Sequence, residues 1–238
     1  MSGQNATVGV IFAVPLEADA FARLASPRRE LRALGLTIHV GTVAGVPVAW
    51  CAAGMGAEAA RQATRLVLAG HAPRLLVSAG FAGGLDPRLA RGSVIRPTRA
   101  VTPEGDPIDL AHGSQDAGSV VTVERIVATA GEKLRLTAAT GARLVDMETH
   151  AVATEARAAG LPCAAVRVVS DAAADELPGE LARLAKPRSA WRRLGGVVGA
   201  IGRRPRLALD LWRLYEHAVV DGRSLAAALA ELCGTIAD

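Results

Sequence analysis

Short apolar runs alternate with longer amphipathic segments along most of the chain. Apolar runs bounded by turn residues are typical of buried strands, and longer amphipathic segments are typical of helices. The alternation therefore predicts an α/β fold with a parallel or mixed sheet. Residues 36–53 hold two apolar runs around Ala44–Gly45, which predicts a hairpin. The other strands are expected at 8–14, 74–80, 92–101, 119–127 and 162–171, and the helices at 15–24 (opened by Pro15), 56–70 (ended by Gly70) and 149–160.

Two glycine-rich stretches, GMGAE at 54–58 and AGFAGGLD at 79–86, follow predicted strands. Ligands of open α/β sheets bind outside the carboxyl ends of the strands, so these stretches are candidate parts of a site. Neither stretch is a dinucleotide-binding motif or a phosphate loop. The alternative is that their glycines serve tight turns and close packing. The polar stretch 102–118 predicts a loop.

The composition is that of one packed domain. Of the 238 residues, 50% are hydrophobic and 3% aromatic, so the core must be built from Ala, Val and Leu. The N-terminal residues lack the features of a signal peptide, and no apolar run is long enough for a spanning helix, so a cytoplasmic location is expected. The three cysteines are far apart and outside any CxxC pair, and the histidines form no ligand-spaced cluster. We therefore expect reduced thiols, no metal and no cofactor.

Positive charge is concentrated in one segment, 183–213, which carries nine basic residues against one acid. It opens a region, 183–238, that is interpreted as a basic amphipathic helical extension of a single domain spanning 1–238. A solvated basic face is one explanation. The other is a peripheral contact with an anionic membrane, in which Trp191 and Trp212 would lie at the interface. Nucleic-acid binding is disfavoured, because stacking aromatics are otherwise missing from the segment.

Acids occur where the core is expected to end. RLVDMETH (143–150) contains Asp146 and Glu148, and VRVVSD (166–171) ends in Asp171. Buried carboxylates are costly unless they are paired or used. A bland alternative is that they cap helices, since acids at helix N-termini complement the helix dipole.

Four stretches in this order, GVIFAVPLEAD, LLVSAGFAGGLD, VDMETHAVA and VRVVSDAAAD, resemble the purine nucleoside phosphorylase and nucleosidase superfamily. The resemblance covers roughly residues 8–175. It implies a three-layer α/β sandwich with a central mixed, partly closed sheet, and cleavage of the N-glycosidic bond of nucleosides. A narrower resemblance, carried by residues 122–153 and the Arg-rich tail, is to the hopanoid-associated branch. That branch removes adenine from adenosylhopane.

The resemblance assigns roles to individual residues. Asp171 matches the general acid that protonates the purine, with Ser170 beside it. Glu148 matches the glutamate that binds the ribose hydroxyls, and Met147 the methionine that packs on the sugar. Ile126 and Val127 match the apolar residues around the base, although they could equally be core. Asp146 has no assigned role and is interpreted as structural.

A second group of residues indicates whether water or phosphate is the nucleophile. Related phosphorylases carry an arginine in a PLRA-like stretch, where this chain has Glu17, and a second arginine where it has Ser78. Glu17 instead matches the glutamate that activates water in nucleosidases, and Arg167 matches an arginine of the same enzymes. Glu17 could also be merely an exposed acid in the first turn of a helix. Gly80 is part of the predicted site, and Phe81 departs from the small polar residue usual there.

The leading hypothesis is thus an N-glycosidase that releases adenine from a lipid-linked adenosine, with water favoured over phosphate as nucleophile. Phosphate stays open as a co-substrate. The alternative is a soluble nucleosidase or phosphorylase for adenosine, methylthioadenosine or futalosine-like compounds. A nucleoside-binding module without turnover is disfavoured, because binding alone does not require an acid at the base. The resemblance also implies a homo-oligomer, and the basic segment would place the enzyme at the inner face of the membrane.

Overall fold

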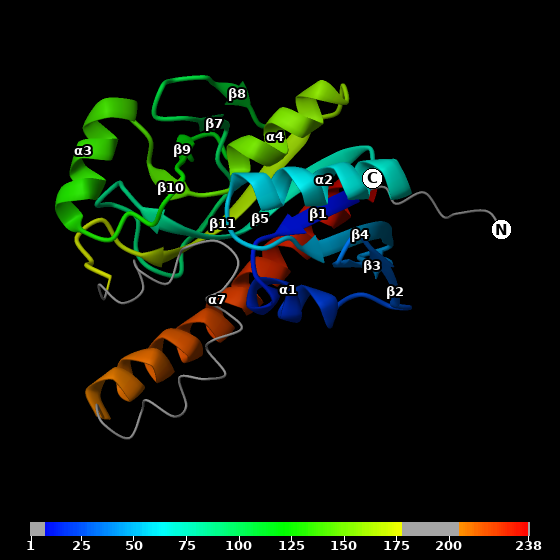
Figure 1. Cartoon of the computed structure of the whole chain (residues 1–238), viewed down its shortest axis with the longest axis horizontal. Helices are drawn as coiled ribbons and strands as arrows, with labels where there is room; N and C mark the ends of the chain where they lie inside the picture. The colour runs from blue at the N-terminus through cyan, green and yellow to red at the C-terminus, as the bar shows by residue number, and fades with distance from the viewer. Residues whose placement is uncertain (1–7, 178–204, 238) are drawn as a thin grey trace.

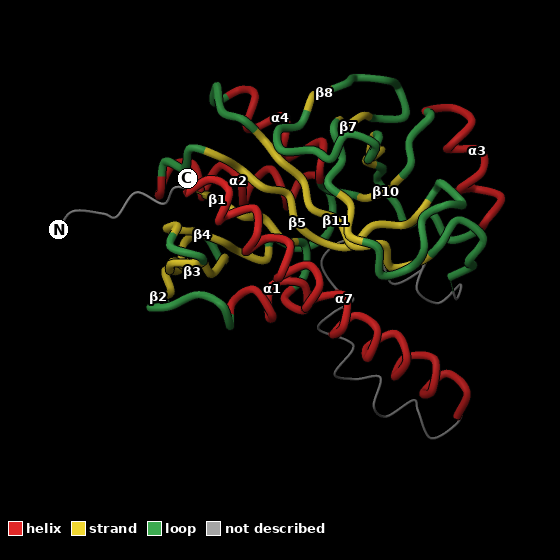
Figure 2. Tube along the Cα trace, turned by 180° about the vertical axis from the view of Figure 1, so that it is seen from behind, coloured by secondary structure: helices red, strands yellow, loops and turns green. Residues whose placement is uncertain are grey.

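The computed structural model describes residues 8–177 and 205–237, and within the second range it describes the side chains of 218–236. One mixed sheet of 11 strands organises these residues (Figures 1 and 2). Its main path runs β2-β3-β4-β1-β5-β10-β9-β7-β8, while β11 pairs with β5 and β6. The strands are β1 (Val8–Phe12), β2 (Arg29–Ala33), β3 (Leu36–Val43), β4 (Val46–Ala52), β5 (Leu75–Gly84), β6 (Val94–Ile95), β7 (Arg99–Val101), β8 (Ile108–Asp109), β9 (Ser119–Thr122), β10 (Leu144–Asp146) and β11 (Cys163–Asp171).

The long strand β5 joins the two halves of the sheet. It pairs in parallel with β1 and with β11, and in antiparallel with the start of β10 at its own carboxyl end. The carboxyl ends of β1, β5, β10 and β11 therefore meet in one region. This region is where a ligand site is expected in such a sheet.

Helices cover both faces of the sheet, as Figure 1 shows. On one face α2 and α4 pack over apolar side chains of the sheet such as Ile11 and Leu76, with Val152 of α4 in the same cluster. On the other face α1 and α7 pack over Phe12, Phe21 and their neighbours. Each layer buries the apolar side of its helices against the sheet, which makes the α/β sandwich that the pattern predicts. The described helices are α1 (Pro15–Ala22), α2 (Ala57–His71), α3 (Ala130–Thr140), α4 (Thr149–Ala158) and α7 (Pro205–Ala237).

The predicted α/β fold with a mixed sheet is confirmed, as are the hairpin of β3 and β4 and the helices α1, α2 and α4. Ala44 and Gly45 occupy the hairpin turn with φ of 49° and 80°. Several details of the prediction were wrong: the expected strand 92–101 is two short strands, β6 and β7, and the expected loop 102–118 contains β8. Gly70 lies inside α2, which ends at His71; the stretch 79–84 belongs to β5 rather than to a turn; and regular strand structure ends at Thr122.

The C-terminal helix is more than an appendage of the sandwich. Leu225, Leu229 and Leu232 of α7 are buried at 0–1% exposure in the same cluster as Phe12 and Phe21. The part of the predicted extension at 218–236 is thus core, whereas 183–204 lies outside the described residues. Within the described part of the chain, no helix is sufficiently long and apolar to cross a bilayer.

Candidate functional site

Two of the predicted catalytic carboxylates contact the same strand, β5, at glycines. A Cβ atom built on Gly80 would lie 2.6 Å from Oε1 of Glu17, and one built on Gly83 would lie 3.2 Å from Oδ2 of Asp171. A side chain at either position would therefore compete with a carboxylate for space. Gly80 and Gly83 are three residues apart, so the two carboxylates contact the strand about 10 Å from each other.

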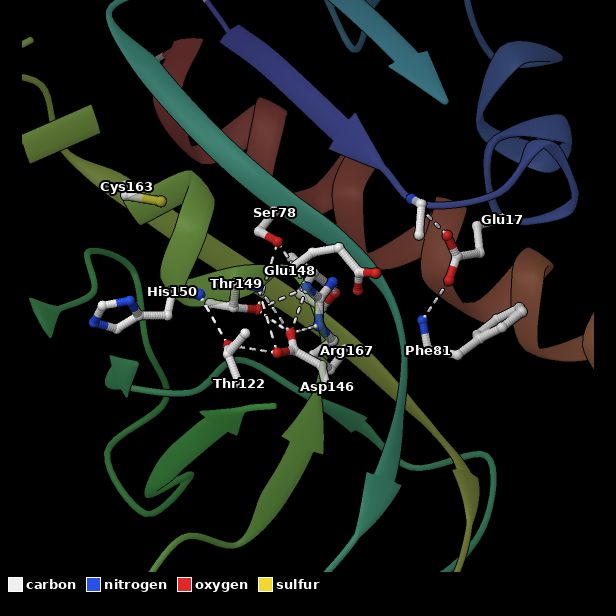
Figure 3. Close-up of polar contacts among 12 residues, drawn as sticks. Glu17, Ser78, Phe81, Thr122, Asp146, Glu148, Thr149, His150, Cys163 and Arg167 are labelled. Atoms are coloured by element: carbon white, nitrogen blue, oxygen red, sulfur yellow. Dashed lines mark hydrogen bonds and ion pairs between the residues drawn. The ribbon is translucent and has the colours of Figure 1, made fainter. Parts of the chain in front are cut away.

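Glu17 is a buried residue of α1, at 5% exposure, and not the exposed first-turn acid of the bland alternative. Its Oε2 accepts hydrogen bonds from the backbone N–H groups of Ala13 and Val14 at 2.9 and 3.0 Å, and its Oε1 accepts one from Phe81 at 2.9 Å (Figure 3). Burial raises the pKa of Glu17, and these hydrogen bonds oppose the shift. A carboxylate held with a raised pKa is suited to act as a general base.

Phe81 contributes to this arrangement through its backbone. Its N–H binds Glu17, so the unusual phenylalanine does not remove that polar contact. The side chain is partly buried and packs against the cluster below α1 and α7. The phenylalanine at this position therefore leaves the support of Glu17 intact.

Asp146 lies at the centre of a buried hydrogen-bond network, which Figure 3 shows. Its Oδ2 forms an ion pair with Nη2 of Arg167 at 2.7 Å, and both side chains are almost fully buried. Oδ1 accepts from the Thr122 hydroxyl at 2.7 Å, and the Thr149 hydroxyl also donates to Oδ2. The Arg167 guanidinium in turn donates to the Ser78 hydroxyl at 2.6 Å. Asp146 is thus structural, as expected, and it is what holds Arg167.

Arg167 acts in this structure through its charge. Its guanidinium is 1% exposed and engaged by Asp146, Ser78 and Thr149, so its contact with a substrate stays a prediction. The positive charge nevertheless lowers the pKa of both Glu17 and Glu148, against the larger effect of burial. It therefore favours the ionised forms of these two carboxylates.

Glu148 occupies the N-cap position of α4 but does not cap the helix. Its Oε1 instead accepts a hydrogen bond of 2.7 Å from the backbone N–H of Gly56, in the glycine-rich stretch after β4. The N–H of Thr149 is satisfied by Asp146. Burial, reinforced by the negative charge of Asp146, raises the pKa of Glu148 to about 8. The helix-cap explanation therefore fits Asp146, and Glu148 is left for another role.

Asp171 is the last residue of β11, and a turn rather than a helix follows it, so the N-cap alternative was wrong. Its Oδ1 accepts a hydrogen bond of 2.6 Å from the hydroxyl of Ser170. Its Oδ2 forms an ion pair with the ammonium group of Lys133 at 2.5 Å. Lys133 was not among the residues predicted for the site.

The remaining predicted residues stay predictions. Met147, Ile126 and Val127 are partly buried, and Val127 packs on the small cluster of Leu85, Val101 and Val145. Met147 lies between Asp146, the last residue of β10, and Glu148, the N-cap residue of α4. In the described ranges, His, Cys, Asp and Glu side chains form no group of three that could hold a metal ion.

Comparison with known proteins matches the family model of the phosphorylase superfamily to residues 7–116 and 113–192. A 5'-methylthioadenosine/S-adenosylhomocysteine nucleosidase of Actinobacillus succinogenes is 25% identical, over 69% of this chain and 85% of its own. The enzyme of the same name from Pseudoalteromonas translucida is 33% identical over 37% of each chain.

Solved structures of such nucleosidases share the fold. The enzyme from S. pneumoniae, with a transition-state inhibitor, superposes with a TM-score of 0.75 at 18% identity, covering 96% of this chain and 99% of the other. That from Neisseria meningitidis gives 0.74 at 17% identity, covering 96% and 98%.

Proposed function

The chain belongs to the phosphorylase superfamily, and from that membership we propose that it is a hydrolytic N-glycosidase that releases adenine from an adenosine-type nucleoside. The proposal is supported by the order of the carboxylates around β5. Glu17 and Asp171 approach this strand from different elements, and Glu148 lies beside the Arg167 network. Glu17 and Asp171 thus both contact β5, at positions about 10 Å apart along the strand, and Glu148 lies within electrostatic reach of Glu17 and Arg167.

The hydrolytic form of the proposal rests on Glu17, a buried carboxylate at the position where the related phosphorylases have an arginine. Phosphorolysis requires cations that hold a phosphate, and here a buried carboxylate fills the place. Its negative charge would repel a phosphate at the same position. Water needs only a general base, and a fixed carboxylate with a raised pKa suits that role.

In the proposed reaction each of these carboxylates has one role. As the bond between C1′ and N9 breaks, its electron pair moves onto the purine, and Asp171 gives a proton to N7. Positive charge develops on the sugar, and Glu148 stabilises it while accepting hydrogen bonds from the ribose hydroxyls. Water attacks C1′ and transfers a proton to Glu17. The products are adenine and a free sugar.

The comparisons favour a substrate such as adenosine or methylthioadenosine over the lipid-linked adenosine of the leading hypothesis. The relatives are named as enzymes for methylthioadenosine and S-adenosylhomocysteine, and adenosylhopane gains no support from them. We therefore propose adenosine and its small thioether derivatives, such as methylthioadenosine, as the first substrates to test. Adenosylhopane stays a second candidate, because of the basic segment 183–213.

One assay tests both the reaction and the substrate. The purified full chain is incubated with methylthioadenosine, adenosine or adenosylhopane, with and without phosphate, and the base and sugar products are identified by mass. We expect adenine and an unphosphorylated sugar, formed at the same rate without phosphate. Strict phosphate dependence, with a sugar 1-phosphate as product, would reject the hydrolytic assignment. Release of no base from any of these compounds would reject the enzyme itself.

A further inference from the structure

Lys133 is a buried lysine that no part of the proposed reaction uses. It is 1% exposed, although it lies in α3, a helix with otherwise exposed or half-buried side chains. Burying an ammonium group is costly unless it is paired, and a methionine or leucine would fill the same space without that cost. The presence of the charge therefore needs a reason.

The ammonium group is held by three oxygen atoms. Nζ lies 2.5 Å from Oδ2 of Asp171, 2.5 Å from the carbonyl oxygen of Ala172 and 3.2 Å from that of Asp175. An ammonium has three N–H donors and no acceptor, so this set of oxygens matches it. Apart from the ion pair, the buried Oδ2 has no hydrogen-bond partner among the described residues. The carboxyl group is thus held by the Ser170 hydroxyl at Oδ1 and by Lys133 at Oδ2.

The lysine also connects the two segments that are expected to contact the base. It projects from the first turn of α3, directly after the segment that contains Ile126 and Val127. Its contacts with Ala172 and Asp175 reach the turn after Asp171, and the backbone N–H of Leu177 donates to the carbonyl of Ala128 at 2.8 Å. Lys133 therefore fixes Asp171 relative to the segment that is expected to bind the purine base.

We infer that Lys133 is a positioning residue for protonation of the leaving purine, an inference that rests on the proposed function. In the free protein the ammonium group pairs with the Asp171 carboxylate, so Asp171 must take up a proton from solvent before it can act as the acid. Once that proton has passed to N7, the group is a carboxylate again. The fixed ammonium group at Oδ2 stabilises that negative charge as it develops. It acts through Asp171, without contact with the substrate, and it requires no proton transfer of its own.

Lys133→Met tests the inference in the full chain, and Arg135→Met is the matched control, because Arg135 is an exposed cation of the same helix. With methylthioadenosine we expect Lys133→Met to lower kcat by about 100-fold with little change in KM, since leaving-group protonation contributes on this scale. Arg135→Met should behave as the wild type. Melting curves establish that the variants are folded.

Two ligands then separate positioning of the acid from support of the fold. Formycin A presents an N–H at the place of N7, whereas tubercidin has a carbon there. We expect Lys133→Met to lower the affinity for formycin A by about tenfold and to leave the affinity for tubercidin nearly unchanged. The reason is that only formycin A can donate a hydrogen bond from this position to the Asp171 carboxylate.

Equal losses for both ligands, or an unchanged kcat in folded Lys133→Met, would overturn the inference. If Lys133→Met does not fold, Lys133→Gln carries the test, because its amide can donate to both carbonyl oxygens without a charge. A wild type without turnover would instead reject the proposed function, which keeps the two failures distinct.

Discussion

Glu148 illustrates how the behaviour of a single residue is set by its immediate surroundings. It has the sequence position of a helix cap, yet Asp146 caps α4 and leaves the Glu148 carboxylate for Gly56 and a ligand. Burial, reinforced by the negative charge of Asp146, raises its pKa to about 8. Asp146 thus affects Glu148 in two ways: it accepts the hydrogen bond of the helix N-terminus in its place, and its charge favours the protonated form of the carboxyl group.

This pKa predicts a pH dependence of stability. Between pH 4.5, the ordinary value, and about 8, the folded protein keeps a proton on Glu148 that the unfolded chain releases. The free energy of unfolding should therefore fall as the pH rises through this window. The glutamine of Glu148→Gln has no proton to lose. As the pH rises across the window, the free energy of unfolding of this variant should therefore increase relative to that of the wild type by at least about 1 kcal/mol. Thermal melts at a series of pH values measure the difference.

Glu17 contributes a slope of the same sign, because its pKa is also raised, so the variant is expected to reduce the pH dependence and not to abolish it. Glu124→Gln is the control, since Glu124 is exposed. Curves for Glu148→Gln that run parallel to the wild type would show that Glu148 is already ionised throughout the window.

At the scale of elements, β5 is shaped by what approaches it. Its glycines at 80 and 83 lie in regular strand, where glycine is otherwise unfavourable, and each makes room for a carboxylate from another element. The strand thereby determines how closely α1 and the end of β11 can bring their acids together. This requirement explains the local sequence better than a turn does.

Two glycine-to-alanine substitutions test this explanation. Gly80→Ala would place a Cβ 2.6 Å from Glu17 Oε1, whereas Gly70→Ala, in α2, would meet no atom within 4 Å. We expect the first to destabilise the fold by about 1–3 kcal/mol and to lower kcat by about 100-fold through displacement of Glu17. The second should stabilise by about 0.5–1 kcal/mol with unchanged activity. Denaturant titrations and the adenine assay provide both quantities.

A background of Glu17→Ala isolates the cause. There the added methyl group has space, so Gly80→Ala should cost clearly less stability than in the wild type. An equal cost in both backgrounds would mean that the strand rejects alanine for a reason unrelated to the carboxylate.

Elements with an apolar pattern of their own could be predicted from the sequence, and the others could not. The hairpin of β3 and β4 was found because its alternation and its turn are local. The helix α3 was missed because its buried side chain is Lys133, which leaves no apolar stripe to detect. The edge strand β2 is almost wholly exposed, and β10 has three residues, too few for a period.

The same contrast applies to the candidate site. Asp171, Glu148 and Glu17 were found by their motifs, and the structure brings Glu17 and Asp171 to one strand. The Arg167–Asp146 pair and the contact of Lys133 with Asp171 join residues that are 21 and 38 positions apart. No local pattern encodes such contacts, because only the packed sheet creates them.

At the scale of the whole molecule, α7 connects regions that carry the two carboxylates. Its described side chains pack against α1, which holds Glu17, and against β11, which ends in Asp171. Arg91 adds a polar link, since it forms an ion pair with Asp221 of α7 at 2.8 Å and donates to the carbonyl oxygen of Ser170 at 2.7 Å. The basic segment 183–213 overlaps this helix from residue 205 onward. Assembly of the protein into a homo-oligomer stays a prediction.

The membrane hypothesis for the basic segment can be tested on the full chain by sedimentation with anionic and neutral vesicles. Each basic residue near an anionic surface contributes roughly 1 kcal/mol, so we expect binding to anionic vesicles that weakens with salt. Replacing Arg203, Arg204 and Arg206 by Gln should abolish most of it. The matched control replaces Arg28, Arg29 and Arg32, exposed residues at β2, and should bind like the wild type. Equal, negligible binding to both vesicle types would leave a solvated basic face.

The close approach of Glu17 to Gly80 also has an evolutionary consequence. A side chain at position 80 would require Glu17 to move or to be replaced, since the two would occupy the same space. Substitutions at the two positions are therefore expected to be linked. Among distant relatives, a residue larger than glycine at this point of the strand should mark chains in which this glutamate is absent or displaced, whatever their overall similarity to this one.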